Sequence, residues 1–100
     1  IALHLHDTYG TALANVQAGW EAGVRCFDAS AGGLGGCPYA PGAAGNLATE
    51  DLVYFLERQG IATGIDLEAV FRASSLVSEV LGRPLPGKNW QRLAAACRSA

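Results

Sequence analysis

At residues 32–46 the sequence reads GGLGGCPYAPGAAGN, with six glycines and two prolines among fifteen residues. This much glycine and proline excludes the interior of a helix or a strand, so the stretch must be a loop. Glycines at this density let backbone N–H groups turn inward, a geometry that binds anions. Flexible linkers favour serine, threonine and charged residues instead. Because a single thiol, Cys37, stands in its middle, we expect a functional loop.

The segments on either side of the loop decide the fold class. Alternating apolar residues predict strands at residues 1–7 and 24–30, the second immediately before the loop. A helix after the first strand, capped by Asp7 or Thr8 and ended by Gly23, carries apolar residues at helical spacing: Ala12, Leu13, Val16 and Trp20. A second helix begins at residues 49–51 and ends at Gly60. The residues of this helix that we expect to face a core are Leu52, Val53, Phe55 and Leu56. The order strand, helix, strand, helix is typical of parallel β/α units in an α/β protein.

The remainder of the chain is predicted to be helical. Residues 61–65 form a connector, and Asp66 caps a third helix that runs through Leu81. Its expected apolar stripe consists of Leu67, Val70, Phe71, Val77, Val80 and Leu81. Residues 82–87 break it, and a last helix over about residues 89–98 docks through Trp90, Leu93 and Ala94. We divide the chain into residues 1–65, the β/α units, and residues 66–100, a helical extension.

Length and composition limit the possible functions. One hundred residues without methionine, opening inside an apolar alternation and offering only two strands, suggest the C-terminal part of a larger protein. A net charge of −2 with seven basic residues argues against a nucleic-acid partner. No apolar run reaches the ~20 residues of a membrane span. Three cysteines without close spacing favour reduced thiols in a cytosol-like compartment, with Cys26 buried and inert in mid-strand and Cys97 exposed.

The two histidines of the chain stand at the end of the first predicted strand. His4 and His6 share one face with their Cα atoms roughly 7 Å apart, so both can reach one metal ion. A single histidine would more simply be a hydrogen-bonded core residue, but a pair on one face favours a metal. Asp28, near the end of the second strand, either orients a ligand or makes a structural hydrogen bond.

Three further stretches carry a resemblance to a known family. Residues 4–10 read HLHDTYG, residues 33–40 read GLGGCPYA and residues 42–54 read GAAGNLATEDLVY. Almost continuously over residues 3–67, the sequence resembles 3-hydroxy-3-methylglutaryl-CoA lyase. Related metal-dependent condensing enzymes such as isopropylmalate synthase share the H-x-H pair, and the GGCPYA loop distinguishes the lyase from them.

The resemblance implies a fold and a reaction. Residues 1–65 would be the last two β/α units of a TIM (β/α)8 barrel, whose active site lies at the C-terminal ends of the strands. The reaction would cleave 3-hydroxy-3-methylglutaryl-CoA to acetyl-CoA and acetoacetate. The family's metal ligands match His4, His6 and Asn46, with an aspartate from the first barrel strand completing a Mg²⁺ or Mn²⁺ site. The catalytic residues match His4, Cys37 as the proton donor to the enolate, and Glu50 as an acid that assists proton transfer.

The resemblance also implies an acyl-CoA substrate, a homodimer, and the bacterial cytoplasm or the mitochondrial matrix. Ala44 departs from the family's frequent serine without touching an assigned role. The first-strand Arg-Asp pair is absent from these residues, so we expect the chain alone to be inactive. Two alternatives stay open: an acyl-CoA condensing enzyme that needs no loop cysteine, and a non-catalytic module that binds phosphate. The second lacks a P-loop and any lysine before Lys88.

Overall fold

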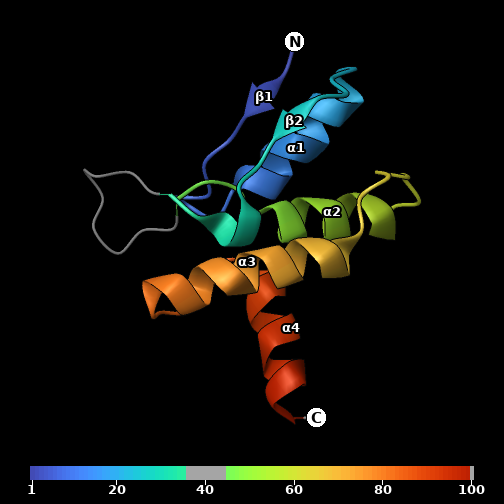
Figure 1. Ribbon diagram of the computed structural model, residues 1–100. Coiled ribbons are helices and arrows are strands. Elements are labelled where there is room, and N and C mark those ends of the chain that lie inside the picture. Colours follow the sequence, from blue (N-terminus) through green and yellow to red (C-terminus); the bar gives the residue numbers. More distant parts are fainter. Residues whose placement is uncertain (36–44, 100) are drawn as a thin grey trace.

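The computed structural model describes residues 1–35 and 45–99 (Figure 1). Cys37 and Ala44 lie outside the described residues. The elements in chain order are β1 (Leu3–His4), α1 (Ala12–Glu21), β2 (Phe27–Asp28), the 3-10 turn η1 (Ala31–Gly33), α2 (Thr49–Arg58), α3 (Leu67–Leu81) and α4 (Lys88–Ser99). The predicted order of strand, helix, strand, helix and two further helices is therefore confirmed.

The two strands pair in parallel, as predicted, with His4 opposite Asp28. Both are shorter than the predicted segments 1–7 and 24–30, because each has the other as its only named strand partner in the described chain. Beyond the strands, isolated bridges join His6 to Asn46 and Ser30 to Ala48. The chain that returns after the glycine-rich loop thus lies against the C-terminal ends of both strands.

Local signals account for where the helices begin and end. The Asp7 carboxylate accepts the Ala12 N–H at 3.1 Å, at the start of α1. The Asp66 carboxylate accepts the N–H groups of Glu68 and Ala69 at the start of α3. Carboxylates stabilise these otherwise unpaired N–H groups. The predicted Asp66 cap is confirmed. The N-cap position of α1 is Thr11, which makes no side-chain cap bond, so Asp7 supports this helix from outside the cap position that was predicted for Asp7 or Thr8. Helix α2 ends at Arg58, just before Gly60.

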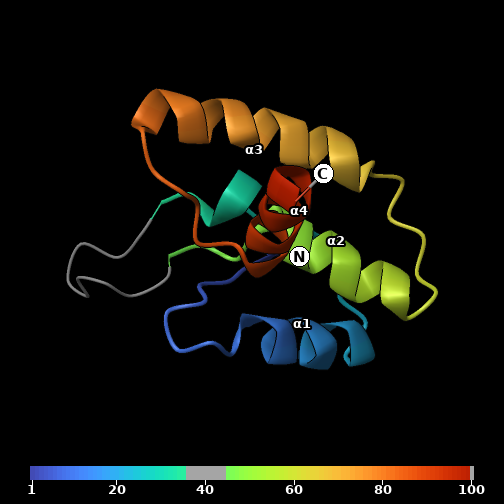
Figure 2. The same cartoon turned by 90° about the horizontal axis from the view of Figure 1, so that it is seen from below.

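Two hydrophobic clusters hold the helices together. The first joins α1, the residues after the loop and α2: Ala12, Val16, Leu47, Leu52 and Leu56. The second joins α4 to the segment before it, with Leu34 and Phe71 packed against it: Leu85, Trp90 and Ala94. In Figure 2, α1 and α3 lie on opposite sides of the molecule with α2 and α4 between them. The helices of the extension, α3 and α4, therefore pack against α2 of the β/α units.

Two expectations are wrong. Cys26 is exposed and lies just before β2, not in mid-strand, although its carbonyl accepts the Leu3 N–H. The apolar stripe of α3 is buried only in part: Val80 is 85% exposed and Leu81 47%, and the fully buried residue of this helix is Ser74. Cys97 is exposed, as expected. Within the described ranges, the structure contains no helix with the length and hydropathy to cross a membrane.

Candidate active site

The two histidines lie side by side at the C-terminal end of β1. The centroids of the His4 and His6 rings are 5.1 Å apart, and the ring planes are nearly perpendicular at 80°. Both side chains are exposed. The structure thus brings together the pair that the alternating pattern placed on one face, with their rings open to a shared ligand.

Asn46 joins the histidines through the backbone and presents an unpaired oxygen. Its bridge to His6 fixes it at the end of β1. The Asn46 Nδ2 group donates to the Leu34 carbonyl at 3.0 Å. The Oδ1 atom is buried and has no hydrogen-bond partner among the residues described. A buried acceptor without a partner is costly, so this oxygen calls for a ligand that the protein itself does not supply.

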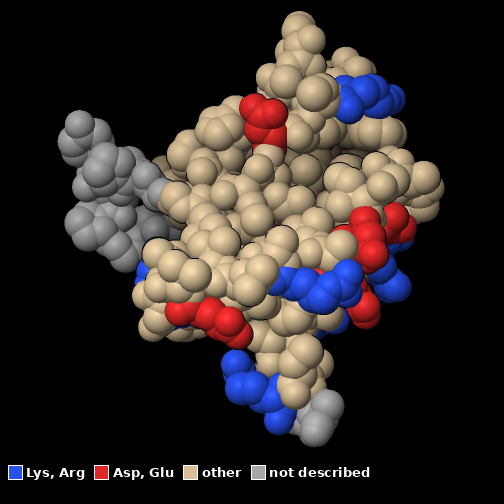
Figure 3. All heavy atoms as spheres, viewed as in Figure 1, with Lys and Arg blue, Asp and Glu red and all other residues tan. Residues whose placement is uncertain are grey.

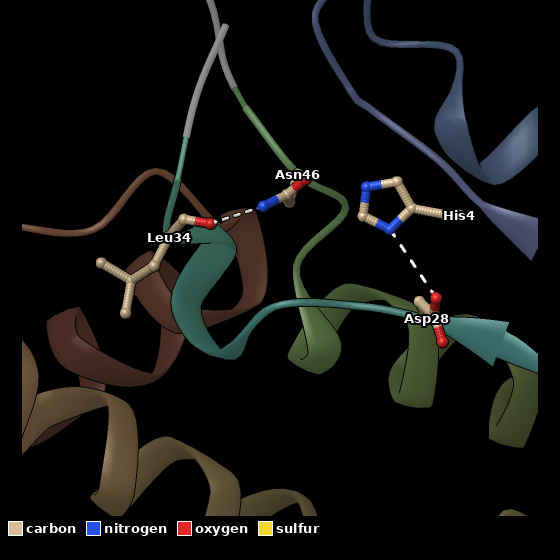
Figure 4. A network of polar contacts seen from close by, with 4 residues as sticks. All are labelled: His4, Asp28, Leu34 and Asn46. Atoms are coloured by element: carbon tan, nitrogen blue, oxygen red, sulfur yellow. Dashed lines mark hydrogen bonds and ion pairs between the residues drawn. The ribbon is translucent and has the colours of Figure 1, made fainter.

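Asp28 lies on the side of the His4 ring that is opposite Asn46 (Figure 4). Its Oδ2 atom lies 3.8 Å from His4 Nδ1, longer than a hydrogen bond, and both side chains are well exposed. In Figure 4 the His4 ring lies between Asp28 and Asn46, with its second ring nitrogen on the Asn46 side. A carboxylate beside one imidazole nitrogen commonly orients the other nitrogen toward a metal. Of the two alternatives for Asp28, the geometry favours the orienting one.

The donor set of this site fits a divalent cation but does not complete its coordination. Two imidazole nitrogens and one amide oxygen suit an ion that accepts mixed nitrogen and oxygen ligands. Among the described residues, no three or more His, Cys, Asp or Glu side chains form a group able to hold a metal. Mg²⁺ and Mn²⁺ prefer at least one carboxylate. A carboxylate from outside these residues, as the family resemblance implies, would meet that need.

The predicted catalytic acid Glu50 is buried, whereas the two histidines are exposed. It is fully buried at the start of α2, and both of its carboxylate oxygens accept hydrogen bonds, from the Gly32 N–H and from the Ser74 hydroxyl. Glu50 therefore does more than interact with the helix dipole in the first turn of α2. The neighbouring Asp51 is also buried, and it accepts bonds from Lys88 and Asn89 at the start of α4.

Sequence reasoning missed the partners of these groups. Ser74 and the Leu34 carbonyl had no assigned part in the site. A buried serine among the apolar residues of α3 was the one available signal for the first, because a polar residue inside an apolar stripe needs a partner. A backbone carbonyl such as that of Leu34 carries no sequence signal at all.

Neither the charged surface nor the hollow described below offers a better candidate site than the two histidines. On the face seen in Figure 3, acidic and basic side chains are interspersed in the lower part, and this face offers no broad basic patch. A hollow of about 520 Å³ lies between α1, α2 and the start of α4, but neither histidine nor Asn46 lines it. We place the site at the histidines, where metal-ligating groups converge.

The curated relatives of this chain include two lyases of nearly equal similarity. A hydroxymethylglutaryl-CoA lyase of Bacillus subtilis is 56% identical over 91 residues, covering 91% of this chain and 30% of the relative. An (R)-citramalyl-CoA lyase of Chloroflexus aurantiacus is 55% identical over 86 residues, covering 86% of this chain and 27% of the relative. The chain thus spans less than a third of the length of either relative.

Solved structures and the family assignment agree with these relatives. The crystal structure of the Bacillus subtilis HMG-CoA lyase superposes with a TM-score of 0.91 at 54% identity, over 94% of this chain and 32% of that one. An HMG-CoA lyase of Acinetobacter baumannii, solved in complex with coenzyme A and 3-methylmalate, gives a TM-score of 0.78 at 52% identity, over 87% of this chain and 28% of that one. Residues 1–77 match the sequence model of the HMGL-like family. This match and the structural relatives show that the chain belongs to that family.

Proposed function

We propose that this chain is the part of a hydroxymethylglutaryl-CoA lyase that supplies most of its metal site, and that residues 1–65 are the last two β/α units of its TIM barrel. The observation that carries the proposal is the buried, unpartnered Asn46 Oδ1 beside the adjacent rings of His4 and His6. All three residues meet at the C-terminal ends of two parallel strands, the edge at which such barrels place their chemistry.

Each residue has a definite task in this proposal. His4, His6 and Asn46 hold Mg²⁺ or Mn²⁺, with Asp28 orienting the His4 ring. When bound, the cation supplies Lewis-acid polarisation of the substrate's hydroxyl and carboxylate oxygens. A base of the complete site takes the proton of the tertiary hydroxyl, and the adjacent C–C bond breaks with its electron pair moving to the thioester side. The Cys37 thiol then donates a proton to that carbon, giving acetyl-CoA, and the remaining fragment is acetoacetate.

A second substrate is favoured by one observation. The citramalyl-CoA lyase matches this chain almost as closely as the hydroxymethylglutaryl-CoA lyase does, at 55% against 56% identity. Both relatives are named as lyases of acyl-CoA compounds, which supports lyase chemistry over a condensing synthase. We therefore include (R)-citramalyl-CoA as the alternative substrate. Further proposals from the family are a homodimer and a place in the bacterial cytoplasm or mitochondrial matrix; a chicken relative carries the name mitochondrial.

The test is a cleavage assay on the complete enzyme that contains this chain, with Mg²⁺ and with each of the two substrates. Cys37→Ser should lower kcat by about 10²-fold or more, the usual loss when a proton-transfer group is removed. Cys97→Ser is the matched control, because it removes an exposed thiol of α4 and should leave kcat unchanged. Cleavage of neither substrate by an enzyme that binds metal would reject the proposal and favour a synthase, and full cleavage activity of Cys37→Ser would reject Cys37 as the proton donor.

A further inference from the structure

The carboxylate of Glu50 is enclosed by protein and bonded at both oxygens. Its side chain is 0% exposed. The Gly32 N–H donates to Oε1 at 2.8 Å, and the Ser74 hydroxyl donates to Oε2 at 2.7 Å. A buried carboxylate is tolerated when hydrogen bonds satisfy it, and these two do so from two different elements, η1 and α3. Neither oxygen is left free to approach a substrate.

The group that Glu50 holds is the turn from which the glycine-rich loop begins. Gly32 has φ +66°, a left-handed conformation that favours glycine, and its carbonyl accepts the Gly87 N–H at 2.9 Å. A Cβ at Gly32 would collide with Leu85. The turn is therefore fixed on one side by Glu50 and on the other by the segment that leads into α4.

The same turn sets the orientation of the proposed ligand Asn46. Two residues after Gly32, the Leu34 carbonyl accepts the Asn46 Nδ2 proton at 3.0 Å, the bond that directs Oδ1 the other way. A shift of the turn would move this carbonyl and release the amide. The contacts thus form a continuous series from Ser74 through Glu50 and the turn at residues 32–34 to Asn46.

We propose that Glu50 is a positioning residue, anchored by Ser74, that fixes the turn at Gly32 and through it the Asn46 amide, and that it exchanges no proton with the substrate. This inference rests on the proposed function and replaces the proton-transfer role that the family resemblance implied for Glu50. Through Ser74, α3 would then help to position the site, although no residue of α3 is proposed as a metal ligand.

Substitutions at Glu50 in the complete enzyme separate the two roles. In Glu50→Gln the amide oxygen can still accept from Gly32 and the NH₂ group can donate to the Ser74 hydroxyl, which both donates and accepts. We expect kcat within about threefold of the unmodified value and an unchanged pH–rate profile, because an anchor needs only the hydrogen bonds. Glu50→Ala removes the anchor and should cost about 10²-fold, as for a misplaced catalytic constellation. A proton-transfer acid would instead lose about 10²-fold or more in both variants.

Two neighbouring serines of α3 provide a matched pair. Ser74→Ala leaves one Glu50 oxygen without its donor, whereas Ser75→Ala removes an acceptor of the Trp90 indole N–H at 3.2 Å and touches neither Glu50 nor the turn. Ser74→Ala should lower both kcat and the affinity for Mn²⁺, measured by electron paramagnetic resonance, by about tenfold. Ser75→Ala should change neither, although each variant loses one hydrogen bond of the same helix. A merely structural role would lower the melting temperature of both variants and leave Mn²⁺ affinity alone.

The outcomes divide cleanly. A folded Glu50→Gln enzyme as inactive as Glu50→Ala would overturn the inference. If Glu50→Gln does not fold, the serine pair decides: a Ser74→Ala enzyme with the Mn²⁺ affinity of Ser75→Ala would also overturn it. If the unmodified enzyme cleaves neither substrate, the proposed function fails, while the Mn²⁺ comparison of the two serine variants still tests the positioning.

Discussion

At the scale of single residues, the candidate site depends on how one amide is turned. Asn46 could present either its oxygen or its NH₂ group to the histidines. The Leu34 carbonyl accepts the NH₂ group, so the oxygen remains for a ligand. The backbone at Gly35 also lies close to this amide. Gly35 has φ +89°, and a Cβ atom added to it would lie only 2.7 Å from Asn46 Nδ2. Glycine is thus required at position 35 both by its conformation and by the space that Asn46 occupies.

We predict that Gly35→Ala weakens Mn²⁺ binding without removing any ligand. The new methyl group displaces the Asn46 amide, and an outer-shell change of this kind costs about tenfold or more in metal affinity. The measurement is a Mn²⁺ titration of the complete enzyme, followed by electron paramagnetic resonance.

Gly60→Ala is the control for that substitution. Gly60 has a similar φ, +83°, but a Cβ there would meet nothing within 4 Å. Both variants should lose about 1 kcal/mol of unfolding free energy from backbone strain, since alanine tolerates this conformation poorly. Only Gly35→Ala should lose metal affinity, and equal affinities for the two variants would contradict the assignment of Asn46 as a ligand.

At the scale of elements, the first turn of α2 holds both helices of the extension. Glu50 is bonded to α3, and Asp51 accepts the Asn89 N–H at 2.7 Å, the Asn89 side chain at 2.8 Å and the Lys88 N–H at 3.1 Å. Asp51 is only 7% exposed. It therefore satisfies the unpaired N–H groups at the start of α4 in place of a capping residue of that helix.

Replacing Asp51 should loosen α4 as a unit. We expect Asp51→Ala to lower the unfolding free energy by about 2 kcal/mol, because it leaves partly buried N–H groups of α4 without acceptors. Asp66→Ala, which removes the exposed cap of α3, should cost about 1 kcal/mol. Urea unfolding followed by tryptophan fluorescence measures both. A smaller loss for Asp51→Ala than for Asp66→Ala would show that α4 does not depend on this carboxylate.

The range of each interaction along the chain explains what could be predicted. The Asp66 cap and the ends of the helices involve residues two to five positions apart, so the pattern of the sequence contains them. The histidine pair follows from the alternation of one strand. The bonds of Glu50 to Ser74 and of Asp51 to Asn89 span 24 and 38 positions, and no local pattern specifies which serine or which helix an acid will meet. Family resemblance named Glu50 but could not say what it touches.

At the scale of the whole molecule, the described residues supply only part of a metal site. Two imidazoles and one amide carry no formal charge to balance a divalent cation, and among the described residues no three or more His, Cys, Asp or Glu side chains form a group able to hold one. The nearby Asp28 carboxylate faces Nδ1 of His4 and is assigned to orient that ring. We therefore expect the 100-residue chain alone to bind Mn²⁺ at least about tenfold more weakly than the complete enzyme, in which an added carboxylate ligand is proposed. It should produce no acetoacetate. Turnover by the isolated chain in a coupled acetoacetate assay would show that the site is complete without further residues.

Substrate choice should lie in the part of the enzyme outside this chain. The chain is almost equally similar to lyases named for two different substrates, and it spans only 30% and 27% of their lengths. Its proposed residues act on the hydroxyl and thioester, whereas selectivity comes from the pocket that surrounds the remaining groups. We predict that a chimera carrying this chain in place of the equivalent segment keeps the preference of its host. The Bacillus subtilis host should favour hydroxymethylglutaryl-CoA and the Chloroflexus aurantiacus host (R)-citramalyl-CoA, each judged by the ratio of kcat/KM values for the two substrates. His4→Ala in either chimera is the inactive control, and one shared preference in both hosts would place selectivity within these 100 residues.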